Sequence, residues 1–180
     1  MALLAEELVE EWLNRQGYFT IRGIRVGVHE IDLLAVRSAP QGLDCRQIEV
    51  QASVRPVSYL TRVPKTVQKE TGRAAGSAKA RDDNELRQDI REWIDKKYDH
   101  PAKMRVRKGL TAGPWSRELV VHQVKHSREL ELIQGSGFAV LRLEDILIQL
   151  KTGGLLLEGA AGSHFVDLVA FTTSGLNGDG

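Results

Sequence analysis

The sequence has one cysteine, Cys45, and no apolar run near the ~18 residues that a membrane-spanning helix needs. A lone cysteine excludes the disulfide framework that staples small secreted domains. The chain also lacks a Gly-x-x-x-x-Gly-Lys-Ser/Thr loop, so we expect no nucleotide cofactor. Its first residues (MALLAEELVEEW) carry acids and no basic stretch, which is atypical of a secretory signal. We therefore expect a cytoplasmic protein with no membrane partner.

A net excess of charge is missing as well. The chain has 25 Lys or Arg against 24 Asp or Glu, a formal net charge of +1. Nucleic-acid binders usually carry a basic excess. The balance is uneven, however, because residues 55–108 hold fifteen Lys or Arg and eight Asp or Glu, a net charge of +7, while the rest carries −6. The neutral total therefore does not exclude a polyanionic partner for residues 55–108.

Hydrophobic periodicity predicts an α/β fold. Leu4, Leu8 and Trp12 recur at helical spacing, and Gly17 ends the helix predicted over residues 1–16. Segments rich in β-branched and apolar residues predict three strands, over 18–26, 28–37 and 45–52. Beyond the basic segment, strand and helix alternate over 118–124, 127–134, 138–143 and 144–151.

These elements predict one domain over residues 1–152, with a mixed central sheet flanked by helices in the order α-β-β-β-α-β-α-β-α. A basic helical insertion occupies residues 55–110. Its best-defined helix covers 82–98, and Lys97 continues the apolar stripe of that helix. Residues 153–180 form a Gly-rich extension, in which Ser163 would cap a short helix over 164–171.

Two acids stand in otherwise apolar strands, Asp32 in VHEIDLLAVR and Glu49 in IEVQ. A buried carboxylate is costly unless it is paired or binds a metal. Neighbouring strands can bring both acids to one end of the sheet, and Mg²⁺ prefers one or two carboxylates together with several waters. The alternative is that both are strand-end residues paired with Arg22, Arg25 or Arg46.

The array of a helix with Glu, a strand ending in Asp, a turn and a strand with Glu-x-Lys resembles the PD-(D/E)XK nuclease superfamily. Small bacterial nuclease-like members carry Gly-Glu-Ile-Asp-Leu-Ile-Ala and then Val-Glu-Val-Lys. This chain has His-Glu-Ile-Asp-Leu-Leu-Ala at 29–35 and Ile-Glu-Val-Gln at 48–51. The resemblance covers residues 5–53 and continues loosely through 118–150. It implies a restriction-endonuclease-like core and a DNA endonuclease that depends on Mg²⁺, with Mn²⁺ as a substitute.

The resemblance also implies roles for single residues. Asp32 matches the central metal ligand, and Glu49 matches the acid of the Glu-x-Lys pair. Glu6 takes the place of the helix Glu, with Glu10 as the fallback. Gln51 replaces the catalytic Lys. Its amide can orient a water, but it supplies no positive charge to the developing phosphorane. A few restriction enzymes of this superfamily carry Gln or Glu there and remain active; the alternatives are an inactive site or a lysine supplied from elsewhere.

The basic insertion offers both a replacement lysine and a DNA surface. Lys65 and Lys69 are the candidates for the lysine. A basic surface beside a metal site suits a phosphodiester substrate, and we assign to it Lys65, Lys69, Lys103, Arg105, Arg107 and Lys108. Alternatively the insertion is a lid or a dimer arm, and a homodimer would cut both strands. Besides the endonuclease, two readings stay open: an inactive nuclease-fold module that binds nucleic acid or a partner protein, and a module of a defence or mobile-element system.

Overall fold

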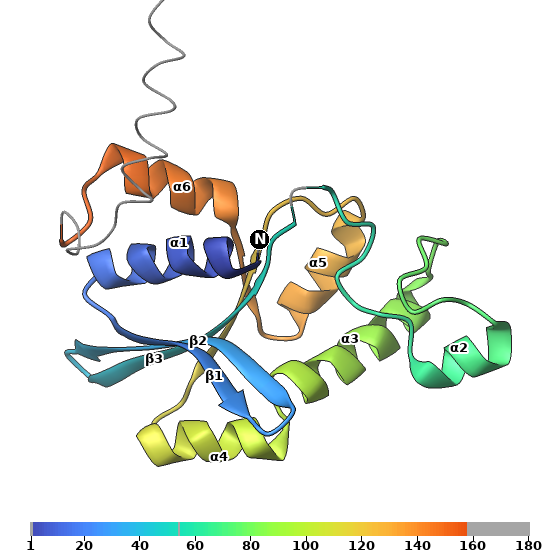
Figure 1. Ribbon diagram of the computed structural model, residues 1–180, viewed down its shortest axis with the longest axis horizontal. Coiled ribbons are helices and arrows are strands. Elements are labelled where there is room, and N and C mark those ends of the chain that lie inside the picture. The colour runs from blue at the N-terminus through green and yellow to red at the C-terminus, as the bar shows by residue number, and fades with distance from the viewer. Residues whose placement is uncertain (1, 54, 158–180) are drawn as a thin grey trace, which may run out of the picture.

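The computed structural model describes residues 2–53 and 55–157, which form a five-stranded mixed sheet with six helices (Figure 1). The elements are α1 (Ala2–Arg15), β1 (Phe19–Val26), β2 (His29–Ala39), β3 (Gly42–Gln51), α2 (Lys65–Thr71), α3 (Asp83–Lys97), α4 (Pro101–Leu110), β4 (Ser116–Val121), α5 (Ser127–Gly135), β5 (Ala139–Arg142) and α6 (Leu143–Thr152). The predicted α/β class, a mixed sheet flanked by helices, is confirmed. The insertion holds three helices in place of one, and the short helix predicted over 164–171 lies outside the described residues.

The sheet follows chain order, β1-β2-β3-β4-β5. The first three strands form antiparallel hairpins, and β3, β4 and β5 run parallel to one another. The hairpin between β2 and β3 is tighter than the predicted strands over 28–37 and 45–52 imply, because pairing continues to Ala39 opposite Gly42. Gly42 has a φ of 124°, which is readily available only to glycine.

Helices cover both faces of the sheet (Figure 1). On one face α1 and α6 pack against Leu33, Ile48 and Val120, and on the other α3 and α5 pack against Leu119 and Val121. The two faces alternate along each strand, as the two-residue period of a strand requires. None of the helices in the described part of the chain is long and apolar enough to cross a membrane.

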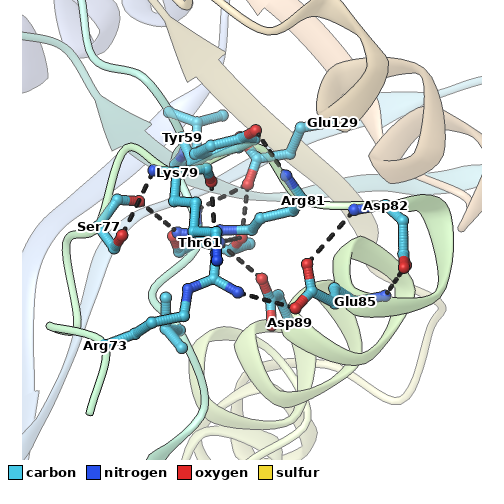
Figure 2. Close-up of polar contacts among 12 residues, drawn as sticks. Tyr59, Thr61, Arg73, Ser77, Lys79, Arg81, Asp82, Glu85, Asp89 and Glu129 are labelled. Atoms are coloured by element: carbon cyan, nitrogen blue, oxygen red, sulfur yellow. Dashed lines mark hydrogen bonds and ion pairs between the residues drawn. The ribbon is translucent and has the colours of Figure 1, made fainter. Parts of the chain in front are cut away.

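A buried polar network ties the start of the insertion to the domain (Figure 2). Arg81 pairs with Asp89 of α3 at 2.6 Å and donates to the Thr61 carbonyl at 3.2 Å. Glu129 of α5 is fully buried and accepts from the backbone N–H groups of Leu60 at 2.7 Å and Thr61 at 2.9 Å. Buried charges are tolerated when they are paired and hydrogen-bonded in this way. The loop around residues 59–61 is therefore fixed against α3 and α5.

Candidate active site

Strands β2 and β3 separate at Asp32. Within residues 2–53 their ladder runs from Ala39 opposite Gly42 to Leu33 opposite Ile48 and ends there. Asp32 and Glu49 come next in that register. Asp32 is buried, and its Oδ2 accepts a hydrogen bond from the backbone N–H of Val50 at 2.8 Å. The Asp32 carboxylate thus takes a position that strand pairing would otherwise occupy.

Glu49 lies fully buried on β3, with one lysine at each carboxylate oxygen. The Nζ of Lys97, at the end of α3, lies 2.7 Å from Oε2. The Nζ of Lys103, in α4, lies 3.2 Å from Oε1 and also donates to the Lys97 carbonyl at 2.8 Å. The side chain of Lys97 is 31% exposed and that of Lys103 only 2%. Two helices of the insertion therefore bring positive charge to the strand acid, and only Lys97 keeps access to solvent.

Burial and neighbouring charges shift the pKa values of the groups in this cluster. Burial raises the pKa of Glu49 from 4.5 to about 7, and the neighbouring charge of Asp32 adds to that rise, while Lys97 and Lys103 oppose it. Burial also lowers the pKa of Lys103. For Lys97 burial acts downward, but the charges of Glu49 and Asp32 prevail and raise its pKa. Glu49 is therefore a carboxyl group that gains and loses its proton near neutral pH.

Glu6 of α1 is the third acid of the cluster. It is buried, and its pKa is raised first by burial and then by the charges of Asp32 and Glu30. Glu10, the fallback choice, lies elsewhere, because it pairs with Arg22 at 3.0 Å and accepts from the hydroxyl of Thr20 at 3.2 Å. The structure thus brings Glu6, rather than Glu10, into electrostatic contact with Asp32.

Strand β3 presents a polar face made of Gln47, Glu49 and Gln51, since alternate residues point to the same side. Gln51 is half-buried at the end of the strand. Gln47 is fully buried; its amide donates to the Lys97 carbonyl at 3.2 Å, and its oxygen accepts from Arg107 of α4. Sequence reasoning missed Gln47, although the alternation in QIEVQ signals a polar face on a buried strand.

Two of the three arginines proposed as partners for the strand acids, Arg22 and Arg46, pair with other acids. Arg46 pairs with Glu118, and Arg22 pairs with Glu7 at 3.1 Å as well as with Glu10. The partners of Glu49 are lysines from the insertion.

The residues assigned to a basic surface fall into two groups. Lys65, Lys69, Arg105 and Lys108 are exposed. Lys103 and Arg107 are buried under α4, so they do not fit the exposed DNA surface to which we assigned them. Figure 1 shows α2, which carries Lys65 and Lys69, at the far end of the insertion from the opening between β2 and β3. Lys97 and Lys103 occupy the place that we predicted for Lys65 or Lys69.

Asp32 and Glu49 are suitable ligands for a hard divalent cation. Mg²⁺ is commonly bound through one or two carboxylates and keeps several waters. A cation would also relieve the repulsion between the acids that raises the pKa values of Glu6 and Glu49. No group of three or more His, Cys, Asp or Glu across residues 2–53 and 55–157 is arranged to hold a metal. The arrangement fits a two-carboxylate site at which lysines and a cation compete for Glu49.

Comparison with known proteins leaves the family open. No family model matches the chain, and no curated protein matches it. A solved structure, the crystal structure of the protein of unknown function AF1548, is similar, with 13% sequence identity and a TM-score of 0.45. The alignment covers 80% of this chain and 64% of that protein, slightly less than two thirds of its length.

Proposed function

We propose that the chain is a metal-dependent DNA endonuclease of the restriction-endonuclease-like type, acting in the cytoplasm with Mg²⁺ or Mn²⁺. The observation that carries the proposal is the gathering of Glu6, Asp32 and Glu49, from three different elements, where β2 and β3 separate. Burial, and after it the charge of Asp32, raises the pKa values of Glu6 and Glu49. Buried acids with perturbed pKa values are typical of functional sites.

Asp32 and Glu49 would hold the cation. When bound, it supplies Lewis-acid polarisation of a phosphodiester oxygen. Gln51 lies on the face of Glu49, where its amide orients the attacking water. Glu6 accepts a hydrogen bond from that water, and its raised pKa moves it toward the range in which a carboxylate also accepts a proton at neutral pH. Hydrolysis leaves a 5′-phosphate.

Lys97 provides the positive charge that Gln51 does not. Its ammonium is already next to Glu49 and is partly open to solvent, so it can move onto a phosphate oxygen as negative charge develops there. Lys103 is enclosed, and it acts by holding Glu49 in place. In this proposal Lys97, at the end of α3, takes the role of the lysine that Gln51 replaces on β3.

A specific observation favours an inactive module as the second candidate. Both carboxylate oxygens of Glu49 are taken by lysines, so a cation must displace at least one of them. A permanent lysine pair could also replace the metal and preserve the fold without activity. Such a module would bind nucleic acid or a partner protein, for instance within a defence or mobile-element system.

Cleavage assays separate the two functions. Plasmid, branched and single-stranded DNA are incubated with the protein in Mg²⁺ or Mn²⁺, and single-turnover rates are compared for wild type, Asp32→Asn and Lys97→Met. Lys96→Met is the matched control, since Lys96 is the exposed neighbour on α3. We expect Asp32→Asn to abolish cleavage, and Lys97→Met to slow it by about 100-fold, the scale of one transition-state contact. DNA binding without cutting in either metal would establish the inactive module instead.

A further inference from the structure

A basic pocket separate from the candidate active site lies farther along α4, between that helix and the loop leading to β4. Its volume is about 220 Å³. Eight residues line it, among them three cationic side chains and an indole: Arg107, Lys108, Arg117 and Trp115. The proposed active site uses none of the three cationic side chains.

The polar groups of this pocket are mostly donors. The indole Nε1–H of Trp115 is buried and has no hydrogen-bond partner in the part of the chain that the structure describes. An unsatisfied buried donor of this kind costs about 1–3 kcal/mol. The acid beside the pocket is Asp99, whose carboxylate lies 2.8 Å from Arg117 and 4.0 Å from Arg107. One carboxylate facing two guanidinium groups leaves an excess of positive charge, and burial and the charge of Arg117 lower the pKa of Arg107.

These groups match an oxyanion. Guanidinium groups bind phosphate oxygens through paired N–H donors, and the Lys108 ammonium adds a further positive charge. The volume is below the ~300–1,000 Å³ typical of pockets for whole small-molecule ligands. The pocket therefore suits one phosphate group with its waters, rather than an entire nucleotide.

The pocket stands at a fixed spacing from the cluster of acids. Arg107 follows Lys103 by one turn of α4, which is about 6 Å along the helix. Their partners on β3, Gln47 and Glu49, are two residues apart, about 7 Å along the strand. The pocket and the acids are therefore neighbours, about one helical turn apart.

We propose that this pocket binds a backbone phosphate of the substrate DNA close to the bond that is cut. The proposal rests on the proposed function, because it takes DNA as the ligand. The pocket fixes the register of the strand over Asp32 and Glu49, and a contact to the backbone alone carries no base specificity.

Two variants of the insertion test the pocket. Lys108→Gln and Lys96→Gln each remove one exposed positive charge from the insertion, but only Lys108 lines the pocket. Binding of a short duplex is measured by fluorescence anisotropy across a range of salt concentrations, in EDTA so that no cleavage occurs. We expect Lys108→Gln to weaken binding about 5-fold and to reduce the salt slope by about 0.9, the value for one phosphate contact, with Lys96→Gln close to wild type. Equal losses of DNA affinity in both variants would show diffuse electrostatic attraction and would refute a phosphate site in this pocket.

The emission of Trp115 identifies the ligand. Wild type and Trp115→Phe are titrated with duplex DNA and, separately, with inorganic phosphate, again in EDTA. We expect DNA to change the emission of wild type and not of the variant. A response to inorganic phosphate alone would mean a free-anion site and would refute the DNA assignment. Because no metal is present, an inactive protein can still pass this test, and a protein that cuts DNA can still fail it.

Discussion

Replacing Glu49 by glutamine should remove a stability cost that grows with pH. Glu49 is fully buried between two lysines, and its pKa is raised from 4.5 to about 7 by burial and by Asp32. A carboxyl group with a raised pKa binds its proton more tightly in the folded than in the unfolded chain. Its contribution to stability is therefore complete below pH 4.5 and is lost as the pH rises through about 7.

The size of the effect follows from the two pKa values. At 1.36 kcal/mol per pH unit, the difference between 4.5 and about 7 is worth about 3 kcal/mol. Some three quarters of it, about 2 to 3 kcal/mol, falls between pH 5 and pH 8. Glutamine has the same shape and does not titrate. Relative to wild type, the free energy of unfolding of Glu49→Gln should rise by about 2 to 3 kcal/mol over this range.

Urea denaturation at pH 5, 6, 7 and 8 measures this difference. Glu92→Gln is the control, because Glu92 is exposed on α3 and its substitution should shift stability by less than about 0.5 kcal/mol at every pH. Parallel pH profiles for wild type and Glu49→Gln would refute the reasoning. If the free energy of unfolding of the variant fell relative to wild type as the pH rises, Glu49 would instead be a structural ion-pair residue that its lysines hold charged.

Two further substitutions test the packing of the insertion. Lys103→Met leaves Glu49 with Lys97 alone, and we expect the free energy of unfolding at pH 8 to fall by about 2 kcal/mol. This loss is below the ~3–5 kcal/mol for breaking a fully buried pair, because Glu49 can take up a proton. Chemical denaturation measures it, and a loss no larger than that of Lys96→Met would contradict it. Glu129→Gln removes the charge that holds Leu60 and Thr61, so we expect a loss of about 2 to 4 kcal/mol and faster proteolysis around residues 55–81 than in the sheet. Unchanged proteolysis there would show that the network of Figure 2 does not anchor the insertion.

Much of the fold follows from local pattern. The helical spacing of Leu8 and Trp12 corresponds to the buried side of α1, and the apolar runs correspond to β2 and β3. The two strand acids were recognisable because a carboxylate in an apolar strand needs a special reason. Strand ends were less well predicted. The predicted strands ended at residue 37 and began again at residue 45, whereas the ladder runs on to Ala39 opposite Gly42.

The lysines beside Glu49 were beyond local pattern. Their position depends on how α3 and α4 fold back over β3, a tertiary contact between residues about fifty positions apart. Lys65 and Lys69 were nearer to Glu49 in sequence, but they lie on the exposed α2. One signal was present, since Lys97 continues the apolar stripe of its helix and a lysine there must reach a buried acid or solvent.

The central claim is that Asp32 and Glu49 form a cation site, and calorimetric titration with Mn²⁺ at pH 7 tests it most directly. Wild type and Asp32→Asn are titrated in two buffers that differ in ionisation enthalpy. The side-chain amide of asparagine can still accept the Val50 hydrogen bond, so the variant should keep its fold. We predict one site in wild type that releases about half a proton on binding, because the pKa of Glu49 is about 7, and no site in the variant. Absence of binding in wild type, or equal binding by both proteins, would contradict the claim.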